Sequence, residues 1–413
     1  MSPQTAPGPL LEPIESLSPR ELGRYARHLS LPGFEDEGQR RLRAASALVI
    51  GAGGLGAPVL QYLAAAGIGQ ITIIDDDVVE ASNLQRQVLH RDTDIGRAKV
   101  DSARDALLRL DPELEVAAIS ERLSPDNALE LFGSHDLVLD GADNFATRYL
   151  SNDAAELTDT PLVWGTIFRF AGQVSTFVPG HGPMLRDLFP DIPEADSVPN
   201  CAEGGVLGVL CGTVGSAMAT EAVKLICGIG TPLIGRLLRY DALASDYSTL
   251  RFSPDPDRPP VTDLAEVAVA CAAAGPRAGG LGIVGENEIG IDEYLDESGP
   301  SVLVDVREEW ERQISCIPES VHVPFEAIRS SGWSALHTAL DLPPTGHEPT
   351  SLDIVVHCKS GARSAQAVKL LRDVAPPASR LRSLAGGIDA WAASGHETVH
   401  APGQSLLAGS HDT

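Results

Sequence analysis

The run Ala47-Leu48-Val49-Ile50-Gly51-Ala52-Gly53-Gly54-Leu55-Gly56 decides the fold of the first part of this chain. Its four leading apolar residues predict a buried strand, and residues 57–67, which follow the glycines, predict a helix. Glycine lets the backbone turn tightly and approach phosphate oxygens, while the helix N-terminus presents free N–H groups to them. We therefore expect Gly51, Gly53, Gly54 and Gly56 to bind nucleotide phosphates. Taken alone, the motif also fits a glycine-rich turn without a ligand.

The alternation of apolar runs and helical segments continues after this motif. Strands are predicted at 71–75, 116–119 and 137–140, helices at 97–110 and 144–158, and two further strands at 161–167 and 172–178. This spacing is typical of an α/β fold with a doubly wound, mostly parallel sheet, which binds ligands at the carboxyl ends of its strands. The sequence thus predicts a Rossmann-like nucleotide site.

The residues after the second strand bear on which nucleotide is bound. Asp75 ends this strand, where a carboxylate can accept hydrogen bonds from ribose hydroxyls. A nicotinamide cofactor would be the default ligand of such a site. The following segment contains Asn83, Gln85 and Arg86, and Lys99 lies further along. Two cations beside a glycine loop suit a triphosphate better than a dinucleotide, whose pyrophosphate has fewer charges.

Two more groups of residues argue for a triphosphate. Asp143 and Asn144 follow strand 137–140 and place a carboxylate where Mg²⁺ and phosphate would bind. Arg27 lies in an N-terminal helix outside the sheet, from which it could reach the phosphates of its own or a neighbouring subunit. Singly, these residues have plainer interpretations: Arg86 could form a surface salt bridge, and Asp143 could be the N-cap of helix 144–158.

Composition excludes several classes of protein. The chain has 413 residues, 43% of them hydrophobic, and a net charge of −26, as expected for an acidic globular protein of two or three domains. Such a charge disfavours binding to nucleic acid. Six irregularly spaced cysteines do not form a disulfide framework, and the N-terminus resembles no secretory signal. The apolar residues 204–230 predict a buried helix hairpin instead of a membrane span. We expect a cytoplasmic protein.

Changes in composition divide the chain. Residues 1–17 are rich in proline and are predicted to be disordered, and residues 18–252 form the first domain. Proline clusters, alanines and glycine pairs mark a linker at 253–286. A second α/β domain is predicted at 287–398, with strands 301–306 and 353–358 and a helix at 362–373, followed by a frayed tail at 399–413.

Five segments of the first domain resemble the E1-like activating family: RYARH (24–28), GAGGLG (51–56), DDDVVEASNLQRQVLH (75–90), GRAKVDSA (96–103) and DGADNFATRYLSND (140–153). Members of that family adenylate the C-terminal glycine of a ubiquitin-like sulfur-carrier protein that ends in Gly-Gly. The resemblance implies an E1-like adenylyltransferase domain that binds ATP through its glycine loop and Asp75. It further implies that Asn83, Arg86 and Lys99 bind phosphates and that Asp143 binds Mg²⁺. Gln85 and Asn144 lie in the same motifs. It also implies a homodimer in which Arg27 reaches the partner's site.

The chain departs from this family at its zinc cysteines. Many relatives have two C-x-x-C pairs, which would fall near residues 182–187 and 251–255, and neither place contains cysteine here. Because a tetrahedral zinc site needs all four ligands, we expect no structural zinc. Cys201 lies in a polar, glycine-rich segment and resembles the family's crossover-loop cysteine, which can bond covalently to the carrier. Cys211 and Cys227 lie in apolar helical sequence and are expected in the core.

The second domain contains a thiol loop, Cys358-Lys359-Ser360-Gly361-Ala362-Arg363-Ser364, between a strand and a helix. Backbone N–H groups and the helix N-terminus would favour a thiolate or persulfide at Cys358. Phosphatases use a similar loop, usually one residue longer, and remain an alternative. The runs 302–311, 358–364 and 384–391 resemble rhodaneses, which implies that Cys358 carries a persulfide, while Asp305 and Arg307 are expected to form a buried structural pair.

An E1-like domain joined to a rhodanese domain resembles the adenylyltransferase/sulfurtransferase enzymes of molybdenum cofactor biosynthesis. We expect the first domain to form a carrier acyl-adenylate and Cys358 to supply sulfur, with Cys201 helping to release the thiocarboxylate. Thiosulfate or a cysteine desulfurase would be the sulfur donor. Two alternatives remain open: an adenylyltransferase whose rhodanese domain only docks the carrier, and a nicotinamide-dependent oxidoreductase.

Overall fold

The computed structural model describes residues 8–193, 205–273, 287–297, 299, 301–342, 352–376 and 379–401. The chain divides into two compact units, Met1–Gly275 and Pro276–Thr413, and each is described by itself.

The first unit begins with three helices that precede the sheet, α1 (Pro19–Arg24), α2 (Ala26–Leu29) and α3 (Glu35–Ala44). Its strands are β1 (Ser46–Ile50), β2 (Gln70–Ile74), β3 (Glu115–Ile119), β4 (Leu137–Asp140), β5 (Leu162–Phe168), β6 (Ala171–Phe177), β7 (Arg236–Asp241) and β8 (Asp246–Arg251). The connecting helices are α4 (Gly56–Ala66), α5 (Lys99–Leu110), α6 (Ala128–Gly133), α7 (Phe145–Thr158), α8 (Leu185–Leu188), α10 (Gly208–Cys227) and α11 (Ala265–Ala273), with short 3-10 turns at Ala81–Asn83 and Asp92–Asp94.

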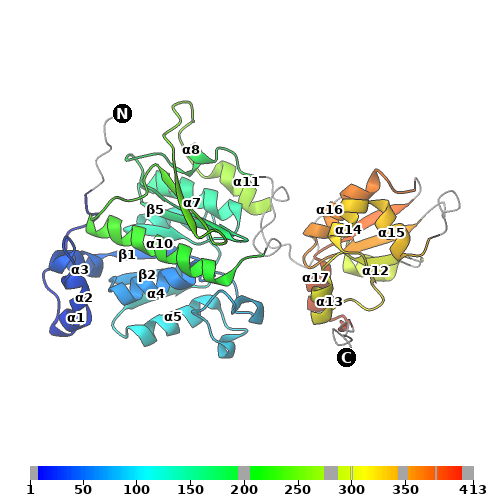
Figure 1. Cartoon of the computed structure of the whole chain (residues 1–413), viewed down its shortest axis with the longest axis horizontal. Coiled ribbons are helices and arrows are strands. Elements are labelled where there is room, and N and C mark those ends of the chain that lie inside the picture. The colour runs from blue at the N-terminus through cyan, green and yellow to red at the C-terminus, as the bar shows by residue number, and fades with distance from the viewer. Residues whose placement is uncertain are drawn as a thin grey trace, which may run out of the picture. The chain divides into compact units, whose positions relative to one another are not determined.

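These strands form one sheet in the order β3-β2-β1-β4-β5-β6-β7-β8. Strands β1 to β5 pair in parallel, whereas β6, β7 and β8 are antiparallel to their neighbours. The strand order reverses between β1 and β4, and the carboxyl ends of such adjacent strands leave a crevice for a ligand. The predicted doubly wound, mostly parallel sheet is therefore confirmed (Figure 1).

Alternating strand residues fill two cores, one on each face of the sheet, because successive side chains of a strand point to opposite faces. On β1, Ala47 and Val49 pack with residues of α3, α4, α5 and α10, whereas Leu48 and Ile50 pack with residues of α6, α7 and α11. Helices cover both faces of the central strands β1, β2 and β4, which explains why these strands are continuous apolar runs in the sequence.

The apolar segment predicted as a helix hairpin is instead the single helix α10, so that prediction was wrong. It ends at Gly228, which adopts a left-handed conformation (φ 66°). By length and composition α10 could cross a membrane, but it packs against α4, β5, β6 and α3, and most of its apolar window is buried. Cys211 and Cys227 lie on this helix and are buried, as predicted.

Two predicted boundaries differ from the structure. Residues 8–17, assigned to a disordered N-terminus, run along the first unit, where Leu10 N–H donates to Leu225 O and Leu17 is buried. The linker expected at 253–286 includes α11, which packs against α7 through the buried Leu264 and Val267. Alanine-rich composition marked this segment as a linker, yet alanine also favours helix, and tertiary contacts decided between the two.

The second unit is a smaller parallel α/β structure. Its strands β9 (Glu288–Ile289), β10 (Val302–Asp305), β11 (Val321–His322), β12 (Asp353–His357) and β13 (Arg380–Leu384) pair in the order β11-β10-β12-β13-β9. Its helices are α12 (Ile291–Asp296), α13 (Glu309–Ile314), α14 (Phe325–Ser331), α15 (Trp333–Ala339), α16 (Ala362–Arg372) and α17 (Gly387–Ala393). Val399, the first residue of the predicted tail, exchanges backbone hydrogen bonds with Cys316.

Candidate functional site

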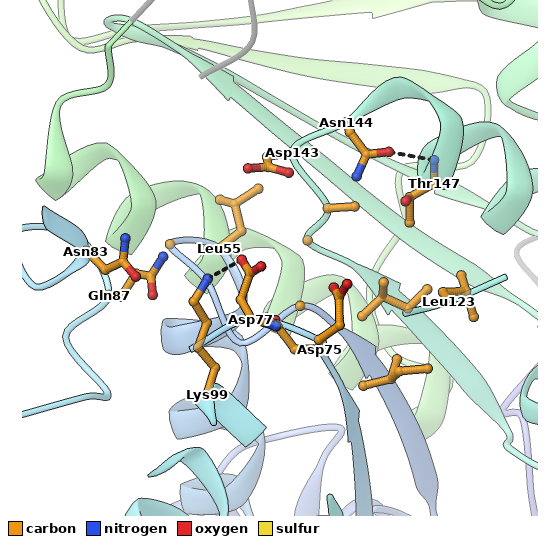
Figure 2. A pocket seen from close by; sticks show the side chains of 18 of the residues that line it. Leu55, Asp75, Asp77, Asn83, Gln87, Lys99, Leu123, Asp143, Asn144 and Thr147 are labelled. Atoms are coloured by element: carbon orange, nitrogen blue, oxygen red, sulfur yellow. Dashed lines mark hydrogen bonds and ion pairs between the residues drawn. The ribbon is translucent and has the colours of Figure 1, made fainter. Parts of the chain in front are cut away.

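A cavity of about 330 Å³ lies at the carboxyl ends of β1, β2 and β4, where the strand order reverses. Nine of the predicted nucleotide-binding residues line it: Gly51, Gly53, Gly54, Asp75, Asn83, Arg86, Lys99, Asp143 and Asn144. Figure 2 shows how side chains from several separate segments surround this space. Two predicted residues, Gly56 and Gln85, do not line it.

The glycine loop is fixed from both sides through Ala52. Asp75 Oδ2 accepts a hydrogen bond from Ala52 N (2.8 Å), and His90 Nε2 lies 2.9 Å from Ala52 O, to which it donates. Burial raises the pKa of the Asp75 carboxyl, and the charge of Lys99 offsets part of this effect. Asp75 therefore supports the loop as well as facing the cavity.

Gly56 and Gln85 lie where segments of the first unit pack closely against one another. A Cβ atom on Gly56 would lie 1.8 Å from the carbonyl oxygen of Gly51, so only glycine allows α4 to start this close to β1. Gln85 lies beside the start of α10, where a Cβ on Gly208 would meet its carbonyl oxygen at 2.2 Å. The glutamine of this segment that lines the cavity is Gln87, two residues further on.

Two cations enter the cavity from the segments after β2. Lys99, at the start of α5, is buried and its Nζ lies 2.7 Å from Asp77 Oδ2 (Figure 2). Arg86 Nη1 donates to Ser82 O (3.1 Å) and forms no ion pair among the described residues, so the surface salt bridge considered for it is not seen. Both cations remain within the cavity lining, where an anionic ligand would pair with them.

Asp143 and Asn144 differ in what they do locally. Asn144 is the N-cap of α7, and its Oδ1 accepts a hydrogen bond from Thr147 N at 2.9 Å (Figure 2). Asp143 is exposed to the cavity and makes no hydrogen bond with the described residues. The helix-capping interpretation of Asp143 is therefore wrong, because its neighbour takes that position.

An exposed carboxylate of this kind fits a hard cation. Mg²⁺ prefers carboxylate oxygens and keeps its remaining positions for water and substrate phosphates, so Asp143 alone can anchor it. A second acidic group, Asp75, Asp76 and Asp77, has ligand oxygens within 4.8 Å of one another, but Lys99 already pairs with Asp77. Asp143 remains the better candidate.

The structure adds cavity residues that the sequence analysis did not select. Thr147 and Arg148 reach the cavity from the first turn of α7, and Glu121 and Arg122 from the segment after β3. Arg148 donates to Ala142 O and lies over the Trp164 ring (6.0 Å). Thr147 and Arg148 belong to the same E1-like motif as Asp143, which was the available signal, whereas no pattern marked residues 121–122.

A second cavity of about 590 Å³ adjoins the first and shares Asp143, Arg148 and Ile167 with it. The rest of its lining is mainly aromatic and aliphatic, from α7, β5, β6, α8 and the segment after α8: Phe145, Tyr149, Trp164, Thr166, Phe168, Ala171, Gln173, Leu185, Leu188, Phe189, Pro190, Asp191 and Pro193. Asp143 thus lies at the junction of a polar and an apolar cavity.

The structure does not assign two further predicted residues to this cavity. Arg27, in α2, is exposed and does not line the cavity of its own chain. Cys201 lies outside the described residues.

The thiol loop of the second unit connects β12 to α16. Cys358 is buried, and its Sγ accepts hydrogen bonds from Gly361 N (3.1 Å) and Ser364 Oγ (3.6 Å). The 11-residue helix α16 begins directly after Gly361, so its positive end faces the sulfur. Gly387 packs against this loop, since a Cβ there would lie 2.5 Å from Cys358 O. A backbone N–H, a hydroxyl group and the first turn of a helix therefore converge on the Cys358 sulfur.

The two basic residues of the thiol loop differ in their surroundings. Arg363 forms a two-pronged ion pair with Glu311 (2.7 Å to each oxygen), so part of its charge is neutralised, while Lys359 is exposed. Asp305 and Arg307 form the predicted buried pair, with Nε–Oδ1 of 3.0 Å and Nη2–Oδ2 of 2.8 Å. Burial lowers the pKa of the neighbouring His357 to about 4.

Family models match both units: the ThiF family over residues 25–260 and the rhodanese-like domain over residues 291–394. The chain is 46% identical to the probable adenylyltransferase/sulfurtransferase MoeZ of Mycobacterium tuberculosis, over 93% of this chain and 96% of that protein. It is 40% identical to the adenylyltransferase and sulfurtransferase MOCS3 of Bos taurus, over 95% of this chain and 90% of that protein.

Other matches cover the first unit. The SAMP-activating enzyme E1 of Haloferax volcanii is 48% identical over 59% of this chain and 90% of its own length. The crystal structure of E. coli MccB superposes with a TM-score of 0.53 at 21% identity, covering 60% of this chain and 75% of that one, which shows a shared fold. From its two domains and its relatives over nearly the whole sequence, the chain belongs to the adenylyltransferase/sulfurtransferase family, in which a ThiF domain is joined to a rhodanese-like domain.

Proposed function

We propose that this enzyme adenylates the C-terminal glycine of a ubiquitin-like sulfur-carrier protein ending in Gly-Gly and then converts that carboxylate to a thiocarboxylate. The observation that supports this most directly is Asp143 at the junction of the two cavities. The polar cavity suits ATP, because its glycine loop and two cations suit phosphates. The apolar cavity suits the C-terminal tail of the carrier, and the two ligands would meet beside Asp143.

Adenylation at this junction needs charge neutralisation more than a protein nucleophile. A carrier carboxylate oxygen attacks the α-phosphorus of ATP, the bond to the β-phosphate oxygen breaks, and pyrophosphate leaves. Both reactants are anions, so Arg86 and Lys99 lower the barrier by holding the phosphates. Asp143 would hold Mg²⁺, which when bound neutralises part of the phosphate charge. Asp75 and Asn83 would orient the nucleoside and its phosphates, and the glycine loop would hold the phosphates through backbone N–H groups.

Sulfur transfer would follow on the Cys358 persulfide. The terminal sulfur attacks the acyl carbon and AMP leaves, giving an acyl disulfide with Cys358. A second thiolate then attacks the Cys358 sulfur, which releases the carrier thiocarboxylate and leaves a protein disulfide for an external thiol to reduce. Cys201 is our candidate for that thiol. Thiosulfate or a cysteine desulfurase would restore the persulfide, in the cytoplasm, where thiols stay reduced.

The test is to incubate the enzyme with ATP, Mg²⁺, thiosulfate and a small protein ending in Gly-Gly, and to weigh that protein by mass spectrometry. A gain of about 16 Da, oxygen replaced by sulfur, is expected only when all components are present. Adenylation without any such gain would favour the alternative in which the rhodanese-like domain only docks the carrier. We further propose that the enzyme is a homodimer in which Arg27 reaches the partner's polar cavity.

A further inference from the structure

Five charged side chains form two neighbouring groups of ion pairs in the first unit, away from the polar cavity, and Asn152 Nδ2 donates to one carboxylate of each group. They come from three separate segments: Asp153 and Glu156 from α7, Arg186 and Asp187 from α8, and Arg258 from the segment after β8. We call these five residues the charged clamp. Their side chains are mostly buried, with exposed fractions of 3% for Asp153 and Asp187 and at most 17% for Arg258.

Arg186 joins α8 to α7. Its Nε and Nη2 donate to the two oxygens of Asp153 at 2.7 and 2.8 Å, and its guanidinium lies 5.2 Å from the centre of the Tyr149 ring. The hydrogen bonds to Asp153 raise the pKa of Arg186, although burial opposes this. Such a two-pronged pair fixes orientation as well as distance.

Arg258 and Asp187 join the segment after β8 to α7 and α8. Arg258 donates to both oxygens of Glu156 (3.0 and 3.1 Å) and, through Nε, to Asp187 Oδ1 (2.9 Å). Asp187 also accepts from Met184 N (2.6 Å) at the start of α8 and from Asp255 N (3.0 Å). A single carboxylate therefore binds the start of a short helix to a segment far along the chain.

The clamp lies directly behind the wall of the apolar cavity. Residues 185–193 supply Leu185, Leu188, Phe189, Pro190, Asp191 and Pro193 to that cavity. The same segment is tied to α7 from within, because Tyr149 Oη donates to Phe189 O (3.0 Å) and Asp191 O (2.5 Å). α8 has only four residues and cannot hold this wall by its own hydrogen bonds.

Arg186 and Asp187 lie in the first of the two segments where the zinc cysteines of E1-like relatives are expected, 182–187, and Arg258 follows the second, 251–255. These residues do not fit that metal. Zinc needs four converging sulfur, imidazole or carboxylate ligands. Around 182–187 and 251–258, no three such side chains converge among the described residues, and two guanidinium groups would repel a dication. Asp153 and Asp187 already accept hydrogen bonds at both of their oxygens.

We propose that the charged clamp replaces a metal as the tie between these segments, and that Arg258 and Asp187 are positioning residues for the apolar cavity. Breaking the clamp loosens residues 185–193 while the polar cavity keeps its shape. The effect of the clamp on carrier binding rests on the proposed function of the apolar cavity, whereas its effect on residues 185–193 does not.

The experiment compares Arg258→Ala, Arg258→Lys and Asp187→Asn in the full chain by hydrogen–deuterium exchange. In Arg258→Ala, exchange across 185–193 should rise by about tenfold or more, while the glycine loop at 51–56 stays unchanged. Arg258→Lys should restore part of the protection, since lysine can reach one carboxylate but cannot make the two-pronged contact with Glu156 and the hydrogen bond to Asp187 together. Asp187→Asn keeps the shape of the side chain and removes its charge, and it serves as the test if Arg258→Ala does not fold. Arg104→Ala, which removes an exposed pair with Asp101 on α5, is the matched control.

Kinetics and metal analysis complete the test. With a Gly-Gly-ended protein that supports pyrophosphate exchange, KM for that protein should rise about tenfold in Arg258→Ala, with KM for ATP within about twofold. Unchanged hydrogen exchange at 185–193 in both Arg258→Ala and Asp187→Asn overturns the proposal. The proposal is also overturned if the enzyme retains one zinc per chain from zinc-supplemented medium and removal of that zinc speeds hydrogen exchange at the same residues. Faster hydrogen exchange with an unchanged KM for the carrier supports the clamp and contradicts the proposed carrier site.

Discussion

Asp143 and Asn144 are adjacent residues with separate functions. Asn144 starts α7 by capping it, and this leaves the carboxylate of Asp143 directed at the cavity with no hydrogen bond among the described residues (Figure 2). Because Asp143 contributes nothing to capping and is exposed, removing it should change the chemistry without changing the fold.

Asp143→Ala should lower carrier-dependent pyrophosphate exchange by about 100-fold or more, because it removes the anchor proposed for Mg²⁺. Its melting temperature should stay within about 2 °C of the parent enzyme, as expected for an exposed side chain. Asp126→Ala, an exposed aspartate outside both cavities, is the control and should affect neither property. Pyrophosphate exchange at a near-native rate in Asp143→Ala would show that Asp143 is not part of the site.

His357 predicts a pH dependence for the second unit. Burial lowers its pKa from 6.5 to about 4, so the unfolded state binds the proton more readily, and stability falls as pH decreases from 6.5 toward 4. Between about pH 7 and pH 5 the second unit should lose about 2 kcal/mol of stability through this group. His357→Leu should reduce that slope, as measured by urea unfolding of the full chain followed by hydrogen–deuterium exchange of peptides from the second unit. An equal slope in both proteins would show that other groups cause it.

At the scale of elements, the glycine loop depends on a close approach between β1 and α4. Ala52 is held by Asp75 and His90, and Gly56 lets the first turn of α4 touch the carbonyl group of Gly51. Contacts within the protein therefore fix the shape of the loop, and such preorganisation reduces the entropy cost of binding phosphates.

Gly56→Ala should destabilise the first unit by about 3 kcal/mol or more and weaken ATP binding, since its Cβ would collide with the backbone. Thermal unfolding and ATP titration measure the two effects. Gly212→Ala is the matched control on the exposed side of α10, where a Cβ meets nothing within 4 Å. That control should be neutral or stabilising by about 0.5–1 kcal/mol. Equal behaviour of the two variants would contradict the close-approach argument.

At the scale of the whole molecule, the chain has two units with separate cores, and the proposed adenylation and sulfur-transfer reactions use different units. The residues proposed for adenylation lie in the first unit. Cys358, whose sulfur accepts a hydrogen bond from a backbone N–H beside a helix N-terminus, lies in the second. Substitutions should therefore separate the two activities.

Cys358→Ala should keep pyrophosphate exchange within about twofold of the parent rate, because adenylation needs no thiol. The variant should lose thiosulfate-derived sulfur on the enzyme and thiocarboxylate on the carrier, both measured by mass spectrometry. Added sulfide should partly restore the product, because the acyl-adenylate still forms. Cys316→Ala, which removes another buried cysteine of the same unit, is the control. Thiocarboxylate formed from thiosulfate at the parent rate would place the sulfur elsewhere, and Cys201 would be tested first.

The proposed homodimer gives a complementation test. Arg27→Ala and Asp143→Ala chains should each be inactive alone, because every site lacks either its own Asp143 or the partner's Arg27. Mixing them under conditions that exchange subunits should produce hybrids with one intact site and restore about a quarter of the activity, from one site in half of the dimers. If native mass spectrometry confirms the hybrids and no activity returns, Arg27 does not act in trans.

Local patterns in the sequence were sufficient to predict most of the sheet and nucleotide site. Period and composition placed β1 to β6 within a residue or two, and β1, β2, β4 and β5 are largely runs buried on both faces. The nucleotide residues were found because short motifs follow strand ends. The apolar segment at 204–230 was assigned incorrectly, since burial on nearly all sides hides helical periodicity and its glycines suggested a turn that α10 does not make.

The sequence by itself determined the two α/β units, the glycine loop, the thiol loop and the family, because these depend on residues close together in the chain. Only the tertiary structure decided which side chains become partners. It gave the helix cap to Asn144, brought Gln87 and Arg148 to the cavity, and placed Arg258 against Asp187 and Glu156. Those last partners are 71 and 102 positions away, and a charge in an apparent linker finds them only when distant segments pack and exclude water.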